Sequence, residues 1–165
     1  MKLKLIAGIM AGMLAGQQAY ACLADGAVDG AVFAIPQGTF EVAVAFQQAQ
    51  QRGDVQTYAN SNWSTVQFIL MQKLQSHYQG EVFDITLFEA TGQHFYRFVA
   101  DGEQVNVLAH EVPKSEYQGI IVTDIDVMTA LVRGQMDFAS ADKLGLFFNL
   151  DTSQEFTALM TKAFA

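Results

Sequence analysis

Residues 119–151 constrain the fold more than any other part of this chain. They begin with a β-branched run at 120–122, which favours a buried strand. Thr123 or Asp124 can then cap a helix, because either side chain offers an oxygen to free amides at a helix start. Apolar residues recur at helical spacing beyond this point, namely Val127, Met128, Leu131 and Val132. The pattern predicts a strand followed directly by a helix with one apolar face.

The rest of this segment predicts a turn, a short helix and a further strand. Gly134 should end the first helix with a positive φ, a conformation that glycine takes without steric cost. The apolar run 144–150 is typical of a strand, and would place Phe147 and Phe148 on opposite faces. A closing helix should then begin at Thr152, which forms a capping-box pattern with Glu155.

Helices followed by antiparallel strands are expected upstream. Capping residues and terminal glycines predict helices over 40–52 and 63–79. Thr39 can cap the first helix, and Asn60, Ser61 or Asn62 can cap the second. Turn residues at 91–93 and 101–102 separate three strands, expected at 81–90, 94–100 and 103–110. This order predicts one α+β domain with a mainly antiparallel sheet, N-terminal helices and a closing C-terminal helix.

The C-terminal third resembles the sterol-carrier-protein-2-like (SCP2-like) domains. In that family a hydrophobic strand ends in Thr and a polar residue, and a helix carrying Leu-x-x-Gly follows. An Ala comes seven residues after that Gly, and a second Gly four residues later. The matching positions here are Thr123, Asp124, Leu131, Gly134, Ala141 and Gly145. The first two thirds of the chain match the family only in the order of element types.

The resemblance implies a binding role without catalysis. In SCP2-like domains the closing helix and the sheet enclose a tunnel for an acyl chain, a sterol or an isoprenoid. By resemblance, the residues that could line it here are Met128, Leu131, Phe138, Phe147, Phe156 and Met160. Methionine can reshape around an irregular apolar guest. A Phe and Met stripe at helical spacing is also typical of an ordinary core.

No arrangement of residues in the sequence indicates catalysis, a metal or a cofactor. The hydrolase motif GxSxG, phosphate-binding glycine loops and CxxC are absent from the sequence. His77, His94 and His110 fall on different expected elements, which favours surface or structural roles over a metal site. Asp124 and Asp126 bracket a helix start, where capping is favoured over acid–base chemistry or cation binding.

The N-terminus predicts export. Lys2 and Lys4 precede an apolar stretch at 5–15, and small residues follow at the positions that a signal peptidase requires. The stretch is too short for a membrane span of about 20 residues. We therefore expect a cleaved signal peptide, 1–21, and a single SCP2-like domain, 22–165, in the periplasm or outside the cell.

Cys22, the only cysteine, would follow this cleavage site. A lipidated cysteine of a bacterial lipoprotein would occupy such a position and give a membrane-anchored protein. Lipoprotein signals usually have Leu three residues before the cysteine and a small residue two before it, whereas this chain has Ala19 and Tyr20. Ordinary cleavage is therefore favoured, with a lipid anchor, a free thiol and an intermolecular bridge as alternatives.

The net charge of −8 argues against nucleic acid as a partner and against charge-driven docking on anionic lipids. The leading hypothesis is an exported, noncatalytic protein that binds or shuttles a hydrophobic small molecule such as a lipid, a fatty acid or an isoprenoid. The alternative is a structural or adaptor protein of an envelope complex, with a filled core and no ligand. A small enzyme is the third hypothesis. It ranks last because the sequence shows no catalytic group of residues.

Overall fold

The computed structural model describes residues 35–58, 62–113 and 119–165. The expected signal peptide, 1–21, and Cys22 lie outside these residues. Within the described ranges, no helix has the length and apolar character needed to cross a membrane.

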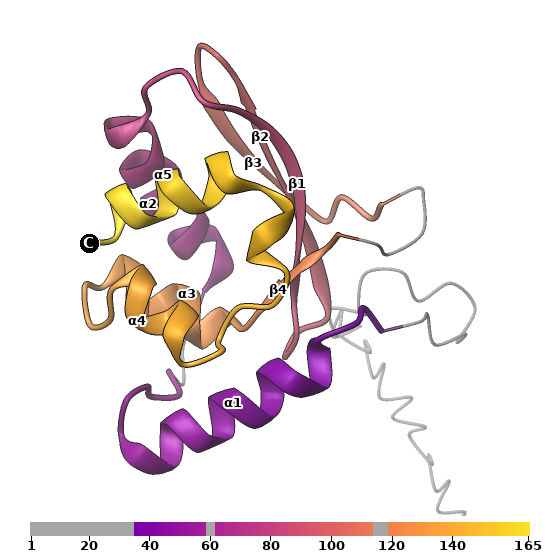
Figure 1. Ribbon diagram of the computed structural model, residues 1–165, viewed down its shortest axis with the longest axis vertical. Coiled ribbons are helices and arrows are strands. Elements are labelled where there is room, and N and C mark those ends of the chain that lie inside the picture. Colours follow the sequence, from indigo (N-terminus) through magenta and orange to yellow (C-terminus); the bar gives the residue numbers. More distant parts are fainter. Residues whose placement is uncertain (1–34, 59–61, 114–118) are drawn as a thin grey trace, which may run out of the picture.

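A four-stranded sheet in the order β3-β2-β1-β4 forms the centre of the fold (Figure 1). Its strands are β1 (Val82–Glu89), β2 (His94–Asp101), β3 (Val105–Ala109) and β4 (Ile121–Thr123). The first three pair antiparallel, as expected from the turns between them, and β4 joins β1 in parallel. The predicted α+β class and mainly antiparallel sheet are confirmed.

Most helices pack on one face of this sheet. They are α2 (Trp63–His77), α3 (Ile125–Val132), α4 (Phe138–Lys143) and α5 (Gln154–Ala163). Together with the sheet they enclose the main core, to which alternate strand residues such as Ile85, Leu87 and Phe98 contribute. The helix α5 closes this layer, in agreement with the predicted closing helix (Figure 1).

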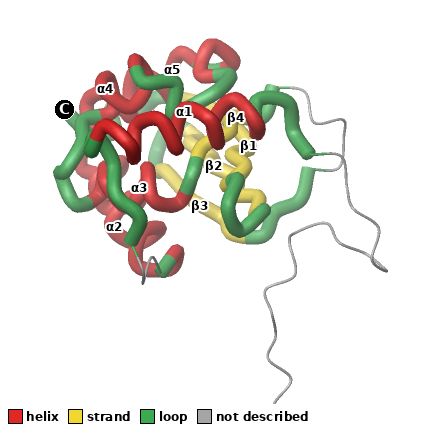
Figure 2. Tube along the Cα trace, turned by 90° about the horizontal axis from the view of Figure 1, so that it is seen from below, coloured by secondary structure: helices red, strands yellow, loops and turns green. Residues whose placement is uncertain are grey.

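The first helix, α1 (Thr39–Arg52), lies across the β4 end of the sheet (Figure 2). Its Val42 packs in a second, smaller cluster with Phe88 and Phe95, on the opposite face from the main core. Its Ala49, two turns later, belongs to the main core. The helix therefore contributes to both clusters and covers one edge of the sheet.

Local signals located several helix ends correctly. Asn62 caps α2 by accepting from the Ser64 N–H at 2.9 Å, and Asp124 caps α3 by accepting from the Asp126 N–H at 2.8 Å. Gly134 follows α3 with φ 66°, as predicted. The expected cap at Thr39 is wrong: Gly38 holds that position, and the Thr39 hydroxyl donates to the Pro36 carbonyl instead.

The expected strand over 144–150 is also wrong. This stretch makes a single bridge, between Val122 and Phe148, and the chain then enters a 3-10 helix, η1 (Leu150–Thr152). Gly145 and Asn149 both have left-handed backbone, with φ of 72° and 66°. The extended segment between these two turns is therefore too short to form a continuous set of strand hydrogen bonds with β4.

The closing helix begins two residues later than expected, because η1 includes Thr152. Ser153 is the N-cap of α5, and its hydroxyl accepts from the Phe156 N–H at 3.2 Å. The predicted capping box of Thr152 and Glu155 is therefore wrong. The two phenylalanines before η1 do diverge as expected: Phe147 joins the main core, and Phe148 packs on the second cluster.

Candidate functional site

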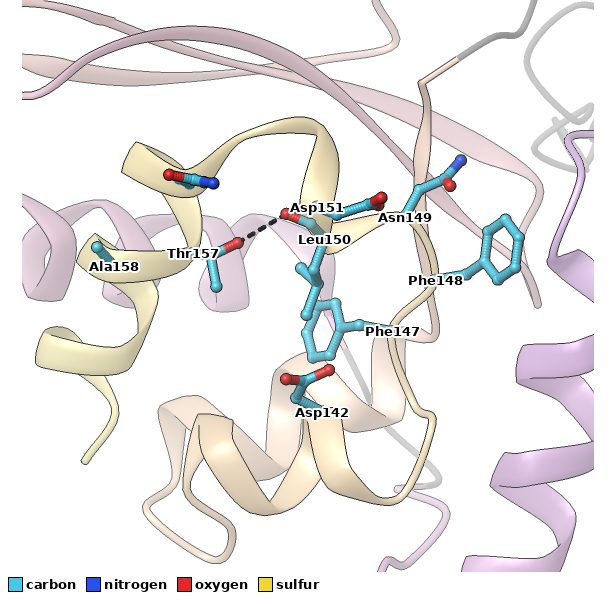
Figure 3. A pocket seen from close by; sticks show the side chains of 9 residues that line it. Asp142, Phe147, Phe148, Asn149, Leu150, Asp151, Thr157 and Ala158 are labelled. Atoms are coloured by element: carbon cyan, nitrogen blue, oxygen red, sulfur yellow. Dashed lines mark hydrogen bonds between the residues drawn. The ribbon is translucent and has the colours of Figure 1, made fainter.

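An open groove of about 580 Å³ lies where the end of α4, the segment 147–151 and the first half of α5 meet (Figure 3). Phe147, Leu150 and Ala158 supply apolar surface, and Asp142, Asp151 and Gln154 supply polar groups. The Thr157 hydroxyl donates to the Leu150 carbonyl at 2.9 Å, which ties α5 to η1 on one side of the groove. A cleft of this size and mixed character can hold a small molecule.

Phe147, the aromatic residue on the core side of the groove, packs against a buried neighbour. Phe147 is 6% exposed, and its ring packs edge-on against Phe138 with the centroids 5.1 Å apart. This packing restrains the Phe147 ring, so little side-chain order has to be gained when an apolar guest contacts it. Asp142 and Asp151 are exposed, so the groove combines apolar surface with negative charge at its border.

The six residues predicted to contact a ligand lie together in the main core: Met128, Leu131, Phe138, Phe147, Phe156 and Met160. Phe147 also borders the groove, and Leu131 borders a smaller pocket of about 310 Å³ near the C-terminus. Phe156 packs edge-on against Phe83 and Phe98, at centroid distances of 5.6 Å and 5.5 Å. Ligand contact by these six residues remains a prediction. Of the six, Phe147 is the one that borders the groove.

A second group of polar residues gathers at one end of the sheet. Glu89 ends β1 and is only 2% exposed, and Asp124, just after β4, is 4% exposed. Because β1 and β4 run parallel, their carboxyl ends meet at the same edge. The backbone N–H groups of Thr91 and Gly92 each donate to Glu89 at 2.8 Å. Thr91 also donates its hydroxyl to Asp124.

Both of these carboxyl groups have raised pKa values. Burial and then the charge of Asp124 raise the pKa of Glu89 from 4.5 to about 7, against the opposing effect of its backbone hydrogen bonds. Burial also raises the pKa of Asp124, although its hydrogen bonds from Thr91 and Asp126 favour the ionised form. Asp126, 7% exposed, accepts a hydrogen bond from the Tyr58 N–H at 3.2 Å.

Two histidines lie at the same end of the sheet. The rings of His94 and His110 are 5.0 Å apart, because β2 and β3 pair antiparallel and bring the start of one beside the end of the other. His77 is elsewhere, with its Nδ1 2.9 Å from the Lys73 carbonyl oxygen at the end of α2. Across the described ranges, no three His, Cys, Asp or Glu side chains group in a way that could hold a metal ion.

Sequence reasoning treated Asp124 correctly as a cap but missed Glu89. One local signal was available. The acidic residue Glu89 follows two apolar residues at the end of the expected strand, and a Thr-Gly turn comes two residues later, where its N–H groups can bind a carboxylate. The proximity of Glu89 to Asp124 depends on the parallel pairing of β1 and β4, which no local signal predicts.

Comparisons of this chain with protein-family models, with curated proteins and with solved structures found no match.

Proposed function

We propose that this protein binds a hydrophobic small molecule without transforming it, and that the groove beside Phe147 receives the ligand. The observation that carries the proposal is the position of the groove. It lies against the closing helix α5, the element that covers the ligand tunnel in the SCP2-like domains that the C-terminal third resembles. We also propose that the protein acts after export, in the periplasm or outside the cell. The signal-peptide pattern of residues 1–21 supports this.

The charge around the groove narrows the class of ligand. Asp142 and Asp151 border it, and the whole chain carries a net charge of −8. A fatty acid carboxylate would meet like charges on entering, which is unfavourable even where solvent weakens the repulsion. A neutral isoprenoid or sterol-like molecule meets no such repulsion. Among the ligands expected from the sequence, the neutral ones are therefore favoured.

Blocking the groove without disturbing the core gives the direct test. Ala158 is exposed on α5 and borders the groove, so Ala158→Trp should fill it while the fold persists. Thr161→Trp is the matched control, since it adds an indole to an exposed position of the same helix that does not border the groove. Binding of a fluorescent isoprenoid alcohol should weaken at least about tenfold in the first variant, which is about 1.4 kcal/mol, and hardly change in the control.

A wild-type protein that binds no neutral apolar probe would contradict the proposal. Equal weakening in both variants would place the ligand somewhere other than this groove. Mass spectrometry of protein purified from its native envelope should identify a copurifying lipid. A stoichiometric protein partner without lipid would instead favour the adaptor hypothesis.

A further inference from the structure

The geometry points to Glu89 as a pH-sensitive latch that joins the β1–β2 turn to the start of α3. A protonated Glu89 holds the two segments together, and an ionised Glu89 beside Asp124 loosens them. This inference is independent of the proposed ligand, since its proton-binding group lies at the end of the sheet rather than in the groove.

The contacts of Glu89 span both segments. Its Oε2 accepts from the Gly92 N–H, and its Oε1 accepts from the Thr91 N–H, each at 2.8 Å, within the turn that follows β1. The same Oε1 lies 3.4 Å from the N–H of Ile125, the first residue of α3. A single buried carboxyl group therefore bridges a hairpin turn and the N-terminus of a helix.

Asp124 makes the bridge sensitive to charge. Its Oδ1 caps α3 through the Asp126 N–H, and its Oδ2 accepts from the hydroxyl of Thr91, the residue whose N–H is bound by Glu89. Two nearly inaccessible carboxyl groups thus share one partner residue. When both are ionised they repel each other in a region from which water is largely excluded, so the repulsion is strong.

The turn between β1 and β2 allows the Glu89 carboxyl group to lie against its backbone. A Cβ on Gly92 would lie 2.6 Å from Glu89 Oε2 and 2.8 Å from the His94 ring, so only glycine allows this approach. The backbone of the turn is also bound to β4, because the Ala90 N–H donates to the Thr123 carbonyl at 2.9 Å. Neither carboxyl can relieve the repulsion without a shift of the turn or of the helix start.

The pKa of Glu89, raised to about 7 by burial and by Asp124, places its titration near neutral pH. Other titratable groups lie near this region on the neighbouring elements: Asp124 before α3, Asp126 in α3, His94 in β2, His110 after β3, and Tyr58 before α2. Histidines as a class also change charge near neutral pH, so the test must separate Glu89 from them.

Carboxyl titration by NMR of the full chain tests the latch in the wild-type protein. The signal of one glutamate carboxyl carbon should shift with a midpoint near pH 7. That titrating signal should be missing in Glu89→Gln. In Asp124→Asn, whose one side-chain oxygen can still cap α3 through the Asp126 N–H, that midpoint should move down by at least about half a unit because the repelling charge is gone. The exposed Glu155→Gln should leave the midpoint unchanged. A Glu89 midpoint below pH 5.5 would overturn the proposal.

Amide hydrogen exchange tests the loosening itself. After correction for intrinsic exchange, protection at Thr91, Gly92 and Ile125 should fall several-fold as the pH rises from 6 to 8. Glu89→Gln, which cannot ionise, should show no such fall. A fall that persists in this variant would assign the transition to another group and overturn the latch. Constant protection in the wild type over this range would overturn it as well.

Discussion

The pH dependence of folding stability is the sharpest prediction, and Glu89→Gln is the perturbation. The folded-state pKa of Glu89 is about 7, against 4.5 without its surroundings. Its folded form therefore holds a proton more tightly than the unfolded chain does. Between these two values the folded state binds more protons, so its stability decreases as the pH rises. The decrease begins near pH 4.5 and is complete above about pH 7.

The magnitude follows from the size of the shift. At about 1.4 kcal/mol for each pH unit, a rise from 4.5 to about 7 corresponds to about 3 kcal/mol. Because Glu89 is 2% exposed, solvent screening reduces this little. Gln cannot ionise, but it replaces one acceptor oxygen by an amide, which costs about 1–3 kcal/mol at every pH. The wild type should therefore gain relative to the variant at low pH, and by pH 8 it should be no more stable than Glu89→Gln.

Urea unfolding of both proteins at pH 5, 6, 7 and 8 measures this effect. The quantity to follow is the difference in unfolding free energy between wild type and Glu89→Gln, because titration of the other groups largely cancels in it. We expect that difference to change by about 2.5 kcal/mol between pH 5 and pH 8, because part of the full effect is already lost at pH 5. A difference that stays constant within about 0.5 kcal/mol would refute the assigned pKa and the reasoning from burial and Asp124.

Three further predictions concern the helix end, the core and the N-terminus. Gly134 has φ 66° and open space where a Cβ would stand, so Gly134→Val should lower the unfolding free energy by about 1–2 kcal/mol through backbone strain alone; a loss below a few tenths in denaturant unfolding would contradict this. Met160 is fully buried in the main core, so Met160→Gln should cost about 2–4 kcal/mol in the same assay, and a near-neutral result would mean that the side chain reaches a cavity or solvent. Intact-mass measurement of the exported protein should give a chain beginning at Cys22. An uncleaved Met1 would contradict the expected signal peptide, and an added diacylglyceryl mass would select the lipoprotein alternative.

Features set by interactions a few residues apart were predictable from the sequence. Asn62 and Asp124 cap their helices with their own side chains, and Gly134 terminates α3 with a positive φ. The three antiparallel strands followed from the turn residues between them. Each of these outcomes depends on the conformational preference of one residue or on a hydrogen bond within about four positions, so the local sequence contains the necessary information.

Features that depend on a distant partner were decided only in the tertiary structure. An apolar run such as 144–150 favours extended backbone, but a strand also needs a neighbour, and β4 offers it only the bridge at Val122. Glu89 likewise acquires its raised pKa from burial and from Asp124, which is 35 positions away along the chain. The local sequence determined the helix caps and the three antiparallel strands, whereas packing determined which charges are buried together, because desolvation and repulsion depend on distances in space rather than along the chain.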